Sequence, residues 1–154
     1  MSVCQDQAEI REMCLDDLGQ VILIEHEIFI FPWTLGNFRD SIKAGYHGRV
    51  LARKDNTLLM GYGILMMGVD EAHLLTLGIG SSWQKQGCGT RLLHHFIEFA
   101  GNNGARSVLL DVRASNMNAA GLYQSLGFEQ IAVRKGYYPA MCGQEDALVM
   151  RLML

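Results

Sequence analysis

The sequence contains few prolines and cysteines, no long apolar run and little net charge, as is typical of an ordinary globular protein. It has two prolines and four cysteines in 154 residues, and the cysteines show neither metal-ligand spacing nor a disulfide pattern, which favours a reducing cytoplasm. Residues 57–69, an uncharged and mostly apolar stretch, fall far short of the roughly 20 residues of a membrane span. A net charge of −3 argues against nucleic acid as a partner. We therefore expect no metal, membrane or nucleic-acid partner, and a monomer.

Periodic hydrophobic residues predict one core and a mixed fold. Hydrophobic residues make up 49% of the chain, which suits a single domain over residues 1–154. Spacing and turn residues predict helices over 18–29, 35–44, 90–102 and 118–126, and strands over 48–54, 57–67, 72–79, 107–112, 128–134 and 146–154. This order predicts the α/β class, with a mixed sheet covered by helices.

Two glycines, Gly87 and Gly89, lie one residue apart where a predicted strand gives way to a helix. A glycine-rich turn at a helix start can bind an anion, because the first N–H groups lack helical acceptors and no Cβ blocks the approach. The spacing is not that of a P-loop, and Leu92 replaces the third glycine of a dinucleotide fingerprint. A pyrophosphate would fit, with Lys85 and Arg91 nearby. Taken alone, the turn could also be glycine-rich without binding anything.

A second segment, residues 109–128, carries polar groups in an apolar setting. Asp111 interrupts an apolar strand, Asn116 and Asn118 stand at a helix start, and Tyr123 lies on the apolar face of that helix. Each has an ordinary structural interpretation: an acid at a strand end, a helix-capping asparagine and a core tyrosine. These interpretations remain open when the segment is considered by itself.

Considered together, the two segments resemble the GCN5-related N-acetyltransferases (GNAT). In that family a glutamine/arginine-x-x-glycine-x-glycine turn cradles the pyrophosphate of acetyl-CoA, and an N-x-x-A-x-x-L-Y-x-x-L-G-F helix follows, here residues 116–128. The resemblance implies the GNAT fold: a central, mostly antiparallel sheet with a parallel splayed pair and helices on both faces. It also implies that the chain is an enzyme and that acetyl-CoA is the acetyl donor.

Further motifs narrow the resemblance to the RimI-type ribosomal-protein-alanine N-acetyltransferases. They are FPW at 31–33, LDVRASN at 110–116, GYYP at 136–139 and EDALVM at 145–150. This implies cytoplasmic acetyl transfer to the N-terminal alanine of a small-subunit ribosomal protein. Two alternatives stay open: a GNAT enzyme acting on another amine, such as a lysine or a small metabolite, and a non-catalytic acyl-CoA-binding module.

The resemblance also assigns roles to individual residues. The strand Leu77, Gly78 and Ile79 would pair with the pantetheine arm, and Asn116 would bond the cofactor. Tyr123 would protonate the departing thiolate. The pyrophosphate would be held by the turn residues Lys85, Gln86, Gly87, Cys88, Gly89 and Thr90. Cys88 itself, inside that turn, is badly placed for a nucleophile and is interpreted as a filler.

The general base departs from the family, which has a glutamate where this chain has Asp111. An α-amine, with a pKa of about 7.8, is partly neutral at neutral pH and needs little help from a base. Asp111 acting through one water could then suffice. Acids also crowd the first 30 residues, which hold seven acids and one base. This segment is either a solvated face or, through Glu25 and Glu27, a surface that faces a cationic peptide N-terminus.

Overall fold

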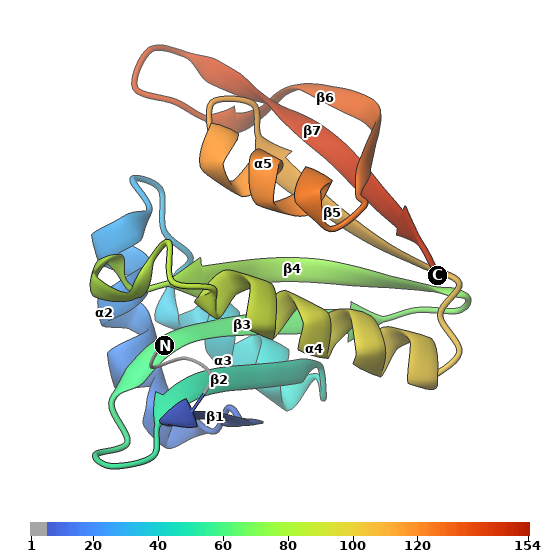
Figure 1. Ribbon diagram of the computed structural model, residues 1–154. Coiled ribbons are helices and arrows are strands. Elements are labelled where there is room, and N and C mark those ends of the chain that lie inside the picture. Colours follow the sequence, from blue (N-terminus) through green and yellow to red (C-terminus); the bar gives the residue numbers. More distant parts are fainter. Residues whose placement is uncertain (1–5) are drawn as a thin grey trace. The chain divides into compact units, whose positions relative to one another are not determined.

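The computed structural model describes residues 6–154, so Cys4 lies outside the described residues. Along the chain the elements are β1 (Ala8–Glu12), η1 (Leu15–Asp17), α2 (Leu18–Ile28), α3 (Leu35–Lys43), β2 (His47–Arg53), β3 (Leu59–Met67), β4 (Glu71–Ile79), η2 (Ser81–Trp83), α4 (Cys88–Asn102), β5 (Ser107–Arg113), α5 (Met117–Ser125), β6 (Glu129–Pro139) and β7 (Gln144–Met153) (Figure 1). All the predicted helices and strands are present, and β1 is an additional strand.

The strands hydrogen-bond in the order β1-β2-β3-β4-β5-β7-β6. The pairs β1–β2, β2–β3, β5–β7 and β6–β7 are antiparallel. β4 and β5 are parallel, with Glu71–Leu74 opposite Ser107–Leu110. The expected mixed, mostly antiparallel sheet with one parallel pair is thereby confirmed.

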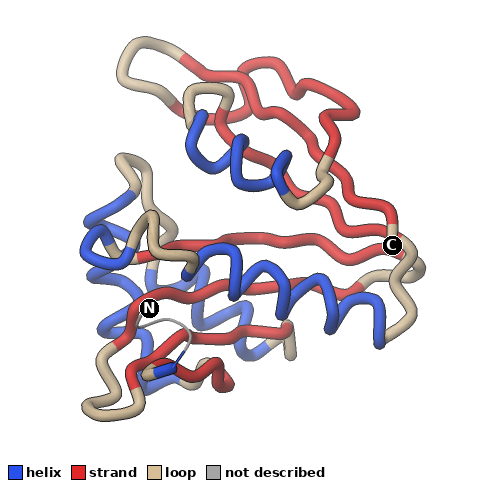
Figure 2. The backbone as a smooth tube through the Cα atoms, viewed as in Figure 1, coloured by secondary structure: helices blue, strands red, loops and turns tan. Residues whose placement is uncertain are grey.

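The described residues form two compact units. The first contains the residues up to Met66 together with Thr76–Phe96, and the second contains Met67–Leu75 together with Ile97–Leu154. Strand β4 and helix α4 each contribute residues to both units. Figure 2 shows the chain in the same view as Figure 1, with helices in blue and strands in red. Among residues 6–154 no helix is long and apolar enough to cross a membrane.

In the first unit, the strands β3 and β4 have helices on both faces. A Cβ at Gly61 would meet Leu92 of α4, and a Cβ at Gly63 would overlap Phe96 of the same helix. On the opposite face Tyr62 packs edge-on against Phe38 of α3, with ring centroids 5.7 Å apart. The glycines of β3 therefore let α4 approach closely, while the intervening tyrosine reaches toward α2 and α3.

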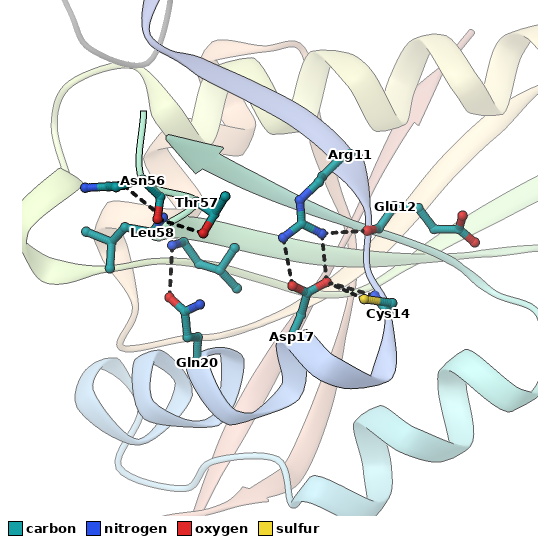
Figure 3. A network of polar contacts seen from close by, with 9 residues as sticks. Arg11, Glu12, Cys14, Asp17, Gln20, Asn56, Thr57 and Leu58 are labelled. Carbon is teal, nitrogen blue, oxygen red and sulfur yellow. Dashed lines mark hydrogen bonds and ion pairs between the residues drawn. The ribbon is translucent and has the colours of Figure 1, made fainter. Parts of the chain in front are cut away.

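The N-terminal strand of the first unit is fastened by Asp17. Its carboxylate accepts two hydrogen bonds from Arg11 of β1, at 2.8 and 2.9 Å, and one from the backbone N–H of Cys14, at 2.9 Å (Figure 3). Close by, the Gln20 side chain of α2 accepts from the backbone N–H of Leu59, at 3.1 Å. Asp17 is also the N-cap residue of α2, but its side chain makes no cap hydrogen bond and instead binds β1 and the preceding turn.

The second unit is built on the central strand β5, with β4 on one side and β7 on the other. Helix α5 follows β5 and ends at Ser125; two residues later stands Gly127, whose φ of +100° lies in the left-handed region that favours glycine. Beyond it, β6 runs to Pro139 and is irregular between Arg134 and Tyr138. There Gly136 has a φ of +58°, and its N–H donates to Asp146.

Candidate functional site

In the first unit, a short turn joins β4 to α4 at the predicted pyrophosphate site. Lys85 and Gly87 both have left-handed backbones, with φ of +61° and +86°. A Cβ at Gly87 would meet nothing within 4 Å. Helix α4 begins at Cys88, and its first-turn N–H groups have no acceptor within the helix. An uncrowded turn that leads into a helix N-terminus can bind a phosphate group through backbone N–H groups.

The turn is held by side chains that point back into the protein. Gln84 donates from its side-chain amide to the Ile79 carbonyl, at 3.0 Å, and Gln86 donates to the Ser82 carbonyl, at 3.0 Å. Glu27 of α2 accepts from both the N–H and the hydroxyl of Ser81, at 2.8 and 2.6 Å. These hydrogen bonds lower the pKa of Glu27. Glu27, one of the acids for which the sequence left a solvated face and a peptide-facing surface open, is thus hydrogen-bonded to the turn and exposed.

Two further residues of this region are turned toward the protein. Arg91, expected near the pyrophosphate, donates to the Ala8 carbonyl of β1 at 2.9 Å. Cys88 is buried, as expected of a filler residue. Among the predicted turn residues, Lys85, Gln86 and Gly87 are exposed, and Gly89 and Thr90 are half-buried. The groups available at this turn are therefore chiefly backbone N–H groups and the Lys85 ammonium.

The predicted pantetheine strand forms the end of β4. Leu77 and Ile79 are half-buried, and a Cβ at Gly63 or Gly61 would meet their side chains on the α4 face. Gly78 is buried and faces the other way, where any Cβ would overlap the Tyr62 hydroxyl. A residue larger than glycine could therefore not occupy position 78 without displacing Tyr62.

Glu25 is buried in the first unit, and this corrects the expectation of a peptide-facing surface acid. Its residue exposure is 2%. One carboxylate oxygen accepts from the Tyr62 hydroxyl at 2.5 Å, and the other accepts from the backbone N–H of Trp33 at 2.8 Å. Burial raises the pKa of Glu25, and the two hydrogen bonds oppose that rise. A carboxyl group enclosed in this way cannot meet a peptide directly.

Asp111 lies in β5 of the second unit, as predicted, on an exposed position of the strand. Asp111 pairs with Val149 of β7, and its carboxylate accepts from the guanidinium of Arg134, at 3.2 Å. The Arg134 side chain in turn lies over the Tyr137 ring, 5.5 Å from its centroid. The base predicted from the sequence is thus an accessible carboxylate with a cationic neighbour.

Tyr123 and Asn116 occupy helix α5 and its N-cap. Tyr123 is 8% exposed, and its ring packs against Phe128 with centroids 5.7 Å apart. Burial, followed by the nearby Tyr138, raises the pKa of the Tyr123 phenol. The Asn116 side-chain oxygen accepts from the Ala119 N–H at 3.2 Å, which makes it a helix cap. The structural interpretations of both residues are therefore correct, and neither interpretation excludes a role toward a ligand.

The sequence prediction gave no role to a cluster on β5, β6 and β7. Arg113 donates to Glu145 at 3.1 Å and to the Pro139 carbonyl at 2.6 Å, and it lies 4.5 Å from the centroid of the Tyr138 ring. Burial, with a contribution from Asp111, raises the pKa of Tyr138 to about 12. The motifs LDVRASN, GYYP and EDALVM contain these residues, so the motifs marked the cluster without indicating its contacts.

The predicted site residues therefore form two groups. The first unit holds 77–79 and 85–90, and the second holds Asp111, Asn116 and Tyr123. Residues 18–128 match the model of the acetyltransferase (GNAT) family. The chain belongs to the GNAT family of acetyltransferases, which confirms the family and fold predicted from the sequence.

Individual relatives extend this assignment. The chain is 35% identical to the ribosomal protein bS18-alanine N-acetyltransferase of Escherichia coli K12, over 88% of this chain and 90% of the relative. It is 34% identical to the enzyme of that name from Haemophilus ducreyi, over 94% of this chain and 99% of the relative. The crystal structure of the ribosomal-protein-S18-alanine N-acetyltransferase from Escherichia coli is similar with a TM-score of 0.87 at 34% identity, covering 95% of this chain and 93% of that one.

Proposed function

We propose that the chain transfers the acetyl group of acetyl-CoA to the α-amine of an N-terminal alanine on a small-subunit ribosomal protein. The observation that carries this proposal is the 35% identity, over 88% of the chain, to an enzyme named for that reaction. Residues 1–154 would act as one acetyltransferase domain in the cytoplasm, where ribosomal proteins are made.

The turn before α4 would hold the pyrophosphate of the donor. Its exposed backbone at Gly87, the first turn of α4 and the Lys85 ammonium fit a doubly charged group, because N–H dipoles and a cation converge there. The backbone of 77–79 would pair with the pantetheine arm as an added strand. An N–H of this strand would polarise the thioester carbonyl.

Tyr123 and Asn116 would serve the donor from helix α5. Burial raises the pKa of Tyr123, so the phenol stays protonated over the physiological range and can give its proton to a thiolate. The oxygen of the Asn116 amide is engaged with the Ala119 N–H, so it is the NH₂ group that would donate to the cofactor. Helix capping and cofactor binding would therefore use different groups of the Asn116 amide, the oxygen and the NH₂.

Asp111 would remove the amine proton, directly or through one water. The demand on this base is small for an α-amine, because about one in four is already neutral near pH 7.4. For a lysine amine, with a pKa of about 10.4, only about one molecule in a thousand is neutral at that pH. A short carboxylate on an exposed strand position therefore suits an N-terminal acceptor better than a lysine.

The proposal is tested by incubating the purified chain with acetyl-CoA and peptides that differ only in their first residues. One peptide carries the N-terminal sequence of the small-subunit protein, and its controls have a blocked α-amine or a first residue other than alanine. Mass spectrometry locates the acetyl group. Acetylation of the free alanine α-amine is expected, whereas modification of an internal lysine alone would contradict the proposal.

A further inference from the structure

Glu25 connects two parts of the first unit that are remote in sequence. Its carboxylate receives the backbone N–H of Trp33, in the connection from α2 to α3, and the hydroxyl of Tyr62 on β3. Both donors reach it inside the protein, since Glu25 is 2% exposed and Tyr62 is fully buried. Burying a carboxylate is costly unless it is well paired, so this arrangement fixes both donors strongly.

Tyr62 carries the connection onward to the end of β4. Its hydroxyl and ring fill the place that a Cβ at Gly78 would take, so the phenol rests directly on the Gly78 backbone. Phe38 packs edge-on against the Tyr62 ring, and Trp33 packs against Phe38 with centroids 5.1 Å apart. The ring of Tyr62 is therefore held from one side by aromatic packing and at its hydroxyl by Glu25.

We propose that Glu25 is a positioning residue for acetyl transfer, acting through Tyr62 on the Gly78 backbone. This inference rests on the proposed function, in which residues 77–79 pair with the pantetheine arm and polarise the thioester. Glu25 touches neither substrate. It sets where the strand N–H groups stand, and a misplacement of about 1 Å can cost about 100-fold in rate.

The substitution Glu25→Gln keeps the shape of the side chain but removes its charge. The glutamine oxygen can still accept from the Trp33 N–H, but its NH₂ group then faces the Tyr62 hydroxyl, which has to turn its proton away. Tyr62→Phe is the gentler variant, because it deletes only the hydroxyl and preserves the ring packing. The exposed acid Glu98 provides a matched control as Glu98→Gln.

The experiment measures turnover, CoA affinity and the Gly78 amide resonance in ¹⁵N-labelled protein for the wild type, both variants, the double variant and the control. We expect Glu25→Gln and Tyr62→Phe each to shift the Gly78 resonance, to leave the Gly101 resonance in place and to lower kcat about 10- to 100-fold. The dissociation constant of CoA should stay within about twofold, because the pyrophosphate turn keeps its own hydrogen bonds. The double variant should lose little more than Tyr62→Phe, since the two residues act in series.

An unmoved Gly78 resonance in the folded variants, or a kcat within twofold of wild type, would overturn the positioning role. A kcat loss without a shift at Gly78 would overturn it equally. Failure of the proposed function has a different signature: the wild type would then acetylate no alanine peptide. In that case the Gly78 resonance of the variants, and its response to added acetyl-CoA, would still decide whether Glu25 sets the strand.

Discussion

The two groups of site residues differ in what they offer a ligand. In the turn before α4, the side chains of Gln84 and Gln86 hydrogen-bond within the protein. The two residues with left-handed backbones, Lys85 and Gly87, are exposed, so their backbone is open to a ligand. In the second unit the proposed chemistry would depend on side chains, namely a buried phenol at Tyr123 and an exposed carboxylate at Asp111. The first group should therefore be sensitive to added bulk, and the second to the loss of single functional groups.

The largest effect is expected from removing the Tyr123 hydroxyl. Tyr123→Phe keeps the packing against Phe128 and deletes only the proton donor, so kcat should fall by about 10²–10⁴, the usual range for one general acid. Steady-state kinetics with an alanine peptide measure this loss. Tyr46→Phe, at a tyrosine of the first unit, is the control and should stay within twofold. An unchanged kcat in Tyr123→Phe would show that this side chain acts by packing alone.

A substitution at Gly89 tests whether the turn needs a residue without a Cβ in order to bind the cofactor. Gly89→Ala should weaken acetyl-CoA binding about 10- to 100-fold, which corresponds to the loss of one or two hydrogen bonds to a charged group. Within helix α4 the same change should raise stability slightly, because alanine favours helices by about 1 kcal/mol over glycine. Calorimetry gives the affinity, and thermal unfolding gives the stability.

Gly101→Ala is the matched control, since it lies in the same helix and its new Cβ would have Leu154 at an ordinary 3.8 Å. It should bind acetyl-CoA as the wild type does. Equal affinities of the two glycine variants would remove the anion-binding role from the start of α4.

Asp111→Asn should have a smaller effect that depends on pH. At pH 6.5 about one α-amine in twenty is neutral, so a base can raise the rate by at most about 20-fold. The ratio of wild-type to mutant rate should fall from about 10–20 at pH 6.5 to under about 2 at pH 9, where the amine deprotonates unaided. A ratio that stays flat from pH 6.5 to 9 would rule out the base and leave the pairing with Arg134 as the role of Asp111.

The sequence predicted the fold well wherever local patterns determine it. Continuous apolar runs marked the buried strands, and Thr34, which caps α3 by accepting from the Asn37 N–H at 3.1 Å, directly precedes the predicted helix 35–44. β1 was missed because a five-residue strand with two apolar side chains has too weak a pattern. β6 was predicted too short because Gly136 resembles a strand end, whereas its N–H donates to Asp146 and the strand continues.

The contacts of the candidate site residues could not be predicted from the sequence. Nothing local distinguishes Glu25 from the other acids of the first 30 residues, because its burial depends on Tyr62, 37 positions away along the chain. The partner of Arg91 is a carbonyl 83 positions away. Long-range packing decides whether such charges face solvent, and single-sequence periodicity contains no information about it.

The smallest effect should come from Lys85, and it tests most directly whether the turn binds through its backbone. Lys85 has a φ of +61°, which strains any residue but glycine. Lys85→Gly relieves that strain and removes the charge, while Lys85→Ala removes the charge and keeps the strain. Both variants should weaken acetyl-CoA binding by only about two- to fivefold, the effect of one exposed ion pair, and the loss should shrink in high salt. Their stabilities should differ, with the glycine variant more stable than the alanine variant by about 0.5–1 kcal/mol. Calorimetry at two salt concentrations and chemical denaturation measure both quantities. A loss of more than about 30-fold in either variant would mean that the Lys85 ammonium, and not the backbone, dominates binding at this turn, and the contrast between the two groups would then fail.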